Sequence, residues 1–289
     1  MEFDPYLYLA FGAGLVAGWI VRPRSPWVPR ATLVTVGLLV GLLGASLDAV
    51  PVPQLLLTIP VSLGFAILIL ALTGALALGL ARGFPPSSPS PLTKAQPDER
   101  VPLSLLLLAA LLGGFAAGHF VAIPTTEAIP WALYALLALV AFDLRLRFEA
   151  LRSLWIPLTA AVAGATAAAL VFVAVVGTAA PVAFATSFAF GWYTLAGPLV
   201  GARAGAALGL LAFLTNFLRE DLTMLLSPVV GRRMRGEGLA ALGGATAMDT
   251  TLYFVTRYGD PDSGSLALAT GLILTVAASL VLPLLLLLP

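Results

Sequence analysis

Long apolar runs follow one another along most of this chain, and no other feature constrains its fold as strongly. A transmembrane α-helix needs about 20 mainly apolar residues to cross the hydrocarbon core of a bilayer. The mean hydropathy is +1.02, and charged residues make up 10% of the chain, which leaves no room for a separate soluble domain. We therefore predict an all-α polytopic membrane protein with eight transmembrane helices, at about residues 7–21, 32–50, 55–81, 103–122, 129–144, 155–177, 204–228 and 265–288.

The composition excludes several kinds of function. The chain has no cysteine and one histidine, which excludes disulfides, thiolate metal sites, cysteine nucleophiles and a multi-histidine metal centre. It carries no HExxH or GxSxG pattern, so we expect neither an enzyme nor a bound metal or cofactor. The net charge of +1 argues against a nucleic-acid partner. Because Glu2 and Asp4 precede the first apolar run, we interpret that run as a mature helix and not as a signal peptide.

An internal repeat organises the first two thirds of the chain. Residues 14–21 read GLVAGWIV and residues 114–121 read GFAAGHFV, an offset of 100. The next pair of helices aligns at an offset of 97, which matches LTIPVS at 57–62 with LWIPLT at 154–159. A unit of three helices is odd, so the second unit must enter the membrane from the opposite side. This is the inverted-topology repeat of many secondary transporters, whose substrate sites lie near the middle of the membrane. Coincidence among helices rich in Leu, Ala and Gly is the alternative.

Basic residues predict the orientation of the helices, because loops rich in Arg and Lys lie on the cytoplasmic side. Both termini then lie outside, provided that segments 183–203 and 239–260 return to the side from which they enter. We therefore predict two re-entrant hairpins, the first entering from outside and the second from inside. If both segments cross fully as discontinuous helices, the chain has ten spans instead. The basic residues concerned are Arg22, Arg24, Arg30, Arg82, Lys94, Arg100, Arg145, Arg147, Arg152, Arg232, Arg233 and Arg235.

The predicted domain organisation follows from the repeat and the hairpins. Residues 1–81 form the first three-helix repeat, and residues 103–180 form the second, inverted repeat. Residues 82–102, rich in Pro and Ser, form a cytoplasmic linker between them. Residues 181–289 form a transport core with the two re-entrant segments and two helices.

Polar residues inside the apolar run near position 220 are the first candidates for a functional site. A carboxylate at the centre of a bilayer costs about 2.5–3.5 kcal/mol on insertion scales, so acids there usually line a substrate or ion path. Asn216, Glu220 and Thr223 lie at i, i+4 and i+7 and share a helix face, with Arg219 beside them. We expect Glu220 to bind a cation or carry a proton and Asn216 to hydrogen-bond the substrate. The structural alternative is an ion pair between Arg219 and Glu220. Asp221 faces away from this stripe and is expected, with Arg219, to reach the inner surface.

Asp249 is the second acidic candidate, in the glycine-rich segment GGATAMDTT at 243–251. Glycines let the backbone approach a ligand closely, and the hydroxyls of Thr246 and Thr250 suit an ammonium group or a small cation. The alternative is that Asp249 caps a helix. Capping and binding are compatible, because a helix that begins at Asp249 would direct its positive end at a bound carboxylate.

Three further residues complete the predicted site. Trp192 and Tyr193 form the aromatic tip of the first hairpin and could cover an aliphatic chain or contact an ammonium group. A place in the interfacial aromatic belt is the alternative. Asp48 lies at the end of the second apolar run, near the outer surface. We expect it to be an exit or proton-release group, and simple solvation at the interface is the alternative.

Three motifs of the transport core resemble a known family. FGWYTLAG at 190–197, the N-x-x-R-E of Asn216 to Glu220 and GATAMDTTL at 244–252 are similar to the LysO-type bacterial lysine exporters. The resemblance extends over essentially the whole chain. It implies export of L-lysine and close analogues such as thialysine, a bacterial inner-membrane location, eight spans and an outside N-terminus. On the matching positions it implies that Asp48 and Glu220 are functional acids.

The charge of lysine makes coupling to an ion necessary. Moving one positive charge outward against an inside-negative potential costs about 2.3 kcal/mol per 100 mV. Exchange of one inbound proton for one outbound lysine would be electroneutral, and a single carboxylate could bind either. We therefore expect lysine/proton antiport, with sodium as the other possible coupling ion. A cation/proton antiporter without an amino-acid substrate is the alternative function. The oligomeric state is open, a homodimer included, and lipid is the surrounding partner.

Overall fold

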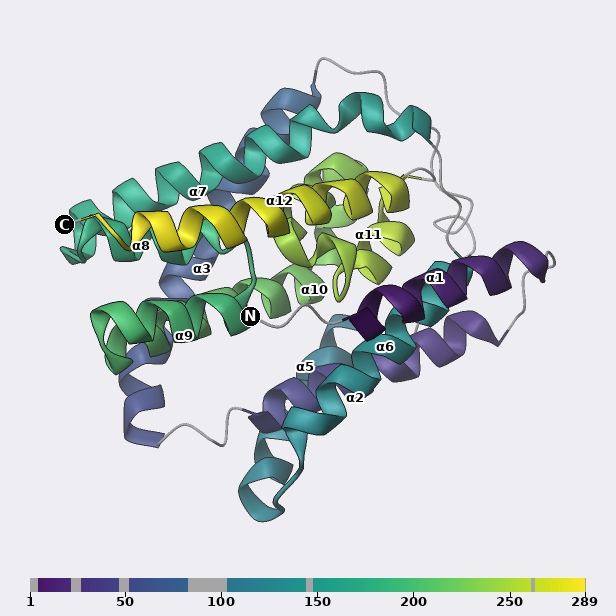
Figure 1. Cartoon of the computed structure of the whole chain (residues 1–289), viewed down its shortest axis with the longest axis horizontal. Helices are drawn as coiled ribbons and strands as arrows, with labels where there is room; N and C mark the ends of the chain where they lie inside the picture. The colour runs from purple at the N-terminus through teal and green to yellow at the C-terminus, as the bar shows by residue number, and fades with distance from the viewer. Residues whose placement is uncertain are drawn as a thin grey trace. The chain divides into compact units, whose positions relative to one another are not determined.

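Helices alone build the part of the chain that the structure describes (Figure 1). The structure is a computed structural model and describes residues 5–21, 27–46, 52–82, 103–143, 148–260 and 263–288. The helices are α1 (Pro5–Ile20), α2 (Val28–Ser46), α3 (Val52–Ala81), α5 (Leu103–Phe120), α6 (Thr125–Asp143), α7 (Trp155–Val176), α8 (Ala180–Phe188), α9 (Tyr193–Ala204), α10 (Ala206–Gly243), α11 (Leu252–Tyr258) and α12 (Ser263–Leu285), with the short 3-10 helices η2 (Phe148–Ser153) and η3 (Gly244–Met248).

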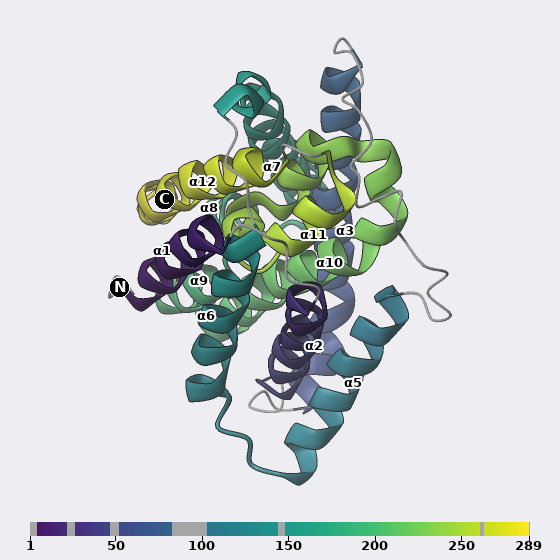
Figure 2. The ribbon, with the colours of Figure 1, turned by 90° about the vertical axis from the view of Figure 1, so that its right-hand side faces the viewer.

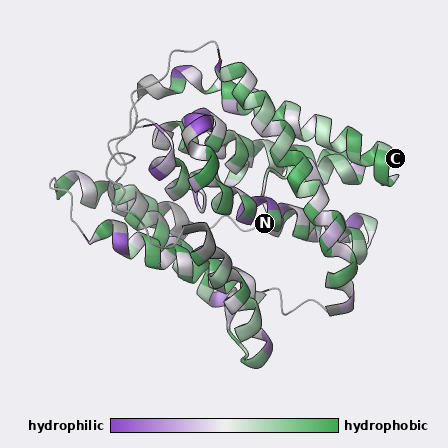
Figure 3. Ribbon diagram, turned by 180° about the vertical axis from the view of Figure 1, so that it is seen from behind, coloured by the Kyte–Doolittle hydropathy of each residue, from purple (hydrophilic) through white to green (hydrophobic). Residues whose placement is uncertain are grey.

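Apolar surface and helix length identify a membrane protein. Within the described ranges, three segments are long and apolar enough to cross a membrane, at Leu56–Ala81, Leu151–Val176 and Ser263–Leu285. Figure 3 shows hydrophobic residues along most of the ribbon. The described residues of each of the eight predicted spans fall mainly on a helix, which confirms the all-α class, whereas the number of crossings stays a prediction.

The chain divides into two compact units. Unit 1 comprises residues 1–52 and 96–146, and unit 2 comprises residues 53–95 and 147–289. The first two helices of each predicted repeat thus belong to unit 1, while the third helices, α3 and α7, belong to unit 2. The boundaries of the repeats themselves stay a prediction.

Close glycine contacts hold unit 1 together, where α1 packs on α6 and α2 packs on α5 (Figure 2). A Cβ atom on Gly14 would lie 2.9 Å from the Cα of Ala138, and one on Gly114 would lie 2.9 Å from the Cα of Gly41. Small residues at such positions let helix backbones approach, which is how helices pack where lipid removes the hydrophobic drive for association.

Unit 2 contains the longest helices and both interrupted segments. The rings of Phe65 on α3 and Phe172 on α7 are stacked with centroids 3.8 Å apart. A Cβ on Gly164 of α7 would lie 2.7 Å from the Cα of Thr73 on α3. The Ser62 hydroxyl donates to the carbonyl of Leu211, 3.4 Å away, and so joins α3 to α10. The bond to Leu211 reaches α10 in the stretch just before Asn216, the first of the predicted site residues on that helix.

Helix α10 is longer than predicted. The predicted span ends at residue 228, but the helix continues past Pro228 and changes direction at Arg235, whose φ of 58° and ψ of −175° are not helical. Proline inside a membrane helix is tolerated where neighbours satisfy the freed backbone groups. The helix therefore extends beyond the predicted apolar run, because hydropathy reports the length of an apolar run and not the residue at which a helix ends.

Candidate functional site

Two helix interruptions lie at the centre of the candidate site, and both fall inside the predicted segments 183–203 and 239–260. The first separates α8 from α9, and there Phe190 and Gly191 have φ values of 52° and 97°. The second separates α10 from α11, beginning at Gly244 with a φ of 64°. A left-handed conformation costs about 1–2 kcal/mol for a residue with a side chain, so its occurrence at Phe190 marks a backbone held by its neighbours.

The two interruptions touch each other. The N–H of Ala245 donates to the carbonyl oxygen of Phe190, 2.9 Å away. A Cβ on Gly191 would lie 3.4 Å from the Cγ2 of Thr246, and a Cβ on Gly244 would lie 2.5 Å from the oxygen of Phe190. Glycine at 244 is therefore required both by its positive φ and by the lack of space. The two predicted segments therefore each contain a helix interruption, and the two interruptions are in contact.

Asn216 hydrogen-bonds the first interruption. Its Oδ1 accepts from the N–H of Gly191 at 2.9 Å, and its Nδ2 donates to the carbonyls of Thr186 at 2.9 Å and Ala212 at 3.0 Å. The side chain thus holds the turn between α8 and α9 against α10. Since both Nδ2 hydrogens are engaged by backbone oxygens, a substrate could reach only the remaining lone pair of Oδ1. The substrate role predicted for Asn216 stays a prediction.

Arg219 contacts the second interruption. Its Nη2 donates to the carbonyl of Leu242 at 3.0 Å and weakly to that of Ala241 at 3.5 Å. These carbonyls lie in the last turn of α10, where a positive charge is favourable. The Nε and Nη1 atoms are buried and have no hydrogen-bond partner in the described part of the chain. Only 1% of the residue is exposed.

Glu220 and Asp221 are buried acids without a hydrogen bond of good geometry to the described residues, although the Thr250 side chain interacts with the Glu220 carboxylate. They are 2% and 3% exposed, and all four of their carboxylate oxygens are without a hydrogen-bond partner among the described residues. A hydrogen-bonded ion pair between Arg219 and Glu220 is therefore not formed. The expectation that Asp221 and Arg219 reach the inner surface is wrong, because both are enclosed by protein. The polar stripe of Asn216, Glu220 and Thr223 does face the interior, as predicted.

Asp221 is a buried acid whose burial we missed from the sequence. Helical periodicity directs it away from Glu220, and that direction was taken to mean exposure. The overlooked signal is the run of three consecutive charged residues, 219–221, inside an apolar helix. Where protein surrounds a helix on all sides, every face of the helix is buried. The direction in which a side chain points therefore does not indicate whether it is exposed.

Asp249 lies in the second interruption with its neighbouring threonines. Its Oδ1 accepts from the N–H of Thr250 at 2.6 Å and from the Thr250 hydroxyl at 3.2 Å. Helix α11 begins at Leu252 with Thr251 at the N-cap position, so the predicted helix start at Asp249 was wrong. The capping alternative fails for the same reason. Asp249 is left as a partly buried acid whose charge acts on Glu220.

Thr246, Trp192 and Tyr193 also lie at or beside the interruptions. The Thr246 hydroxyl donates to the carbonyl of Gly243 at 3.0 Å. The ring of Tyr193 meets Phe213 and Phe217 of α10 edge-on, at centroid distances of 5.3 and 5.5 Å. Trp192 packs against the apolar core of unit 2. Contact of either aromatic residue with a substrate stays a prediction, and Asp48 lies outside the described residues.

The second interrupted segment returns to the point where it began. At the turn in α10, the N–H of Gly236 donates to Oδ2 of Asp260, 3.3 Å away, and Nε of Arg235 lies 3.5 Å from the same oxygen. Arg235 also pairs with Glu237 at 3.6 Å. Burial raises the pKa of Asp260 above its ordinary value, and the Gly236 N–H and the Arg235 charge oppose that shift. The segment between residues 236 and 260 is therefore closed at its base by charged groups.

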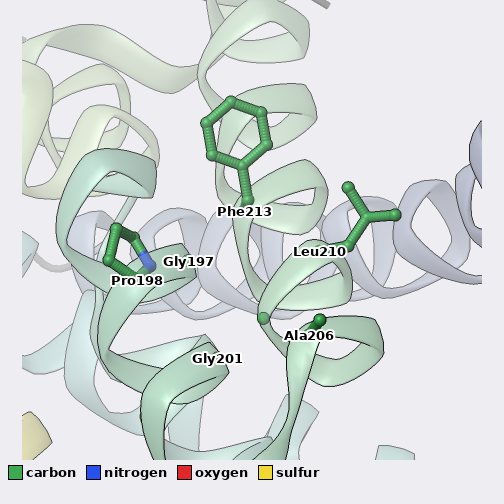
Figure 4. A pocket seen from close by; sticks show the side chains of 7 residues that line it. Gly197, Pro198, Gly201, Ala206, Leu210 and Phe213 are labelled. Carbon is green, nitrogen blue, oxygen red and sulfur yellow. The ribbon is translucent and has the colours of Figure 1, made fainter. Parts of the chain in front are cut away.

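An apolar groove lies apart from these charged residues. Its volume is about 410 Å³, and it runs between α9 and α10 (Figure 4). Phe213 and Leu210 line it from α10, and Pro198 lines it from α9. Since no charged side chain lines this groove, its chemistry suits apolar chains. Within the described ranges, no group of three His, Asp or Glu side chains is arranged to bind a metal ion.

Comparison with known proteins identifies the family. The family model described as lysine exporter LysO matches residues 108–286, which is more than half of the chain. The lysine exporter LysO of Escherichia coli K12 is 31% identical over 187 residues, 60% of either chain. A putative lysine exporter of Haemophilus influenzae is 30% identical over 98 residues, covering 34% of this chain and 50% of that protein. No solved structure matches.

These alignments cover about half to three fifths of the relatives' lengths. The matched residues, 108–286, include both helix interruptions, Asn216, Arg219, Glu220 and Asp249. The chain belongs to the lysine exporter LysO family.

Proposed function

We propose that this protein exports lysine across the bacterial inner membrane in exchange for protons, with Glu220 and Asp249 binding the substrate cation or the proton. The observation that carries this proposal is the position of Glu220, a buried carboxylate without a hydrogen-bond partner on the helix against which both interruptions pack. An ionisable group inside a membrane is costly and is usually retained for function. The names of the relatives supply the substrate.

The charge balance of the site favours a cation. Arg219 carries one positive charge, and Glu220, Asp221 and Asp249 carry three negative charges when ionised. Opposite charges attract strongly where water is excluded, and a second anion would be repelled. Lysine carries a net charge of +1 and two ammonium groups, so it compensates part of this excess. When lysine has left, protons bound to the acids compensate the same negative charge. Exchange of lysine for protons at one site requires that the two bind there in turn.

Contacts along α12 support entry of the two interrupted segments from opposite sides of the membrane. The second segment has its base at the start of α12, where Asp260 contacts the turn at Arg235. The first segment ends near the other end of α12, since Nε of Arg203 donates to the carbonyl of Leu286 at 3.0 Å. The tips of both meet beside Gly271 of α12, where a Cβ would lie 2.5 Å from the nitrogen of Met248. We propose that the segments are re-entrant hairpins entering from outside and inside, respectively.

Packing in unit 1 supports the inverted repeat. Gly114 corresponds to Gly14 at the offset of 100, and Ala138 corresponds to Gly41 at the offset of 97. The contact of Gly14 with Ala138 therefore corresponds to the contact of Gly114 with Gly41. Because exchange of the repeats preserves this pair of contacts, we propose a pseudo-twofold relation between the repeats, with eight spans and the N-terminus outside.

Flux in proteoliposomes tests the function. Purified protein is reconstituted, and labelled lysine is followed under an imposed pH gradient and, separately, under an imposed sodium gradient. We expect pH-driven lysine flux and no flux driven by sodium. Sodium-driven flux alone would replace the proton by sodium as the coupling ion. Proton flux that depends on a metal cation and not on lysine would favour the alternative, a cation/proton antiporter without an amino-acid substrate.

Competition by norleucine tests the role of the acids. Norleucine has a similar aliphatic chain but lacks the side-chain ammonium group, so it would leave an acid unpaired in the site. An unpaired buried charge costs several kcal/mol, and about 1.4 kcal/mol already corresponds to a tenfold loss of affinity. We expect norleucine to compete roughly tens of times more weakly than lysine or thialysine. Equal competition would assign the acids to proton coupling alone.

A further inference from the structure

The guanidinium of Arg219 has hydrogen-bond donors for which the described residues provide no acceptor. Its Nη2 is occupied by the carbonyls of Ala241 and Leu242, but Nε and Nη1 are buried without an acceptor in the described part of the chain. Leaving buried donors unsatisfied costs about 1–3 kcal/mol each, and more when the group is charged. Arginine cannot relieve this cost by losing its proton. A guanidinium in this state is suited to a ligand that brings acceptor oxygens.

Glycines at the two interruptions let the backbone approach the guanidinium closely without placing a side chain on it. A Cβ on Gly191 would lie 3.3 Å from Nη1 of Arg219, and a Cβ on Gly244 would lie 3.0 Å from Nη1 and 2.7 Å from Nη2. At both interruptions, glycine thus keeps side-chain atoms away from the nitrogen that has no partner. Both glycines also have positive φ values, 97° and 64°, so a larger residue is disfavoured by conformation as well as by space.

The surrounding acids restrict which anion can bind. The charges of Glu220, Asp221 and Asp249 act on the same region, so a ligand with only negative charge, such as phosphate, would meet strong repulsion. A ligand that combines one carboxylate with two ammonium groups fits both signs. Its carboxylate would face Arg219, and its ammonium groups would face the acids. A diamine of the same length would pair with the acids but would leave Arg219 unsatisfied.

We propose that Arg219 is the receptor for the α-carboxylate of the substrate and that it makes the site prefer a cationic amino acid over the corresponding diamine. The inference rests on the lysine export proposed above and adds the specificity-determining residue. The hydrogen bonds from Nη2 to the end of α10 position the guanidinium, and Nη1 and Nε provide the free donors. A charge-assisted hydrogen bond between guanidinium and carboxylate is among the stronger ones in proteins.

The first test uses the unaltered protein in proteoliposomes. Exchange of labelled lysine is measured against competing unlabelled lysine, lysinamide and 1,5-diaminopentane. Lysinamide keeps both ammonium groups but lacks the carboxylate charge, and 1,5-diaminopentane lacks the carboxyl group altogether. We expect both to compete at least tenfold more weakly than lysine. Equal competition by all three would overturn the inference while leaving lysine export intact, whereas absence of any lysine exchange would overturn the proposed function.

The second test assigns the preference to Arg219. In Arg219→Gln we expect the preference for lysine over 1,5-diaminopentane to fall at least tenfold, and in Arg219→Lys we expect a smaller fall, because the charge is retained. Arg203→Gln is the matched control, since Arg203 also donates to a backbone carbonyl but lies at the far end of α9, and it should keep the unaltered ratio.

The ratio of lysine competition to 1,5-diaminopentane competition also distinguishes a ligand-binding role of Arg219 from a structural one. If Arg219 only braced α10, its replacement would weaken the exchange of both ligands equally, and an unchanged ratio would overturn the inference. Should Arg219→Gln not fold, the Lys variant decides. In Arg219→Lys, weaker competition by lysine with unchanged competition by 1,5-diaminopentane would support the binding of the substrate carboxylate by Arg219. An equal loss of competition by both compounds would contradict it.

Discussion

At the scale of single residues, adjacent positions on α10 have different surroundings. Asn216 has its amide hydrogens bound by backbone oxygens, Arg219 is half satisfied, and Glu220 and Asp221 have no hydrogen-bond partner among the described residues. A buried polar group whose hydrogen bonds are all made stabilises the fold. A buried polar group without a partner costs free energy of folding and is a candidate for binding a ligand. The difference separates Asn216, which braces the backbone, from the charged residues that we propose as the substrate site.

Glu220→Gln should abolish export driven by a pH gradient. The amide keeps the size of the side chain but can neither titrate nor neutralise a cation, so we expect pH-driven lysine flux to fall at least tenfold, roughly 1.4 kcal/mol or more in transition-state terms. Flux is measured in proteoliposomes, and thermal unfolding in detergent is measured alongside to show that the variant folds. Glu127→Gln is the control, because Glu127 is an exposed acid on α6. Near-normal flux in Glu220→Gln would shift the role to Asp249.

At the scale of elements, the interruptions depend on contacts from other helices. The turn between α8 and α9 has no side-chain cap of its own. It is held instead by Asn216 of α10 and by Ala245 of η3. Backbone groups freed from a helix inside a membrane must find partners within the protein. Each interruption is therefore stable only in the presence of the other elements of unit 2.

Asn216→Ala should destabilise the turn between α8 and α9. It removes the acceptor of the Gly191 N–H, and a buried N–H without a partner costs about 1–3 kcal/mol. We expect the unfolding midpoint in detergent to fall by several degrees, at roughly 2–4 °C per kcal/mol. Thr35→Val is the control, because the Thr35 hydroxyl bonds to Ala31 within the same helix. An unchanged midpoint for Asn216→Ala would show that the turn does not depend on this side chain.

Neighbouring glycines of α5 should respond in opposite ways to alanine. Alanine favours a helix over glycine by about 1 kcal/mol. A Cβ on Gly113 would meet no neighbouring atom within 4 Å, whereas a Cβ on Gly114 would lie 2.9 Å from the Cα of Gly41. We expect Gly113→Ala to leave thermal stability unchanged or to raise it, and Gly114→Ala to lower it by separating α5 from α2. The same response from both variants would contradict the tight packing of unit 1.

At the scale of the whole molecule, the absence of cysteine in the sequence makes the topology directly testable. The first part of α10 joins the end of α9 to the turn at Arg235. Under the proposed topology it begins outside and ends in the cytoplasm. If the two interrupted segments crossed the membrane fully, this direction would be reversed. The side of the membrane on which each end of this helix lies therefore decides between eight and ten spans.

Single cysteines at Ala206 and Arg233, both exposed, should label from opposite sides. A membrane-impermeant maleimide applied to intact cells should modify Ala206→Cys only, and the same reagent applied to inverted vesicles should modify Arg233→Cys only. The reason is the location of the basic turn, which the positive-inside rule assigns to the cytoplasm. The reverse pattern would rule out the re-entrant hairpins and favour ten spans. Lysine flux of each variant confirms that the labelled protein is active.

The amino-acid sequence by itself determined the all-helical class, the family and the position of both interruptions, and it singled out Glu220 and Asp249 as candidate site residues. These features are local: an apolar run depends on its own length, and a break depends on the glycines within it. Tertiary structure alone decided that Asn216 bonds to Gly191, 25 residues away, and that Asp221 is enclosed. It also decided that Arg219 bonds to the end of α10 rather than to Glu220. The physical reason is that burial and hydrogen-bond partners are set by helices distant in the chain, which hydropathy and helical periodicity do not report.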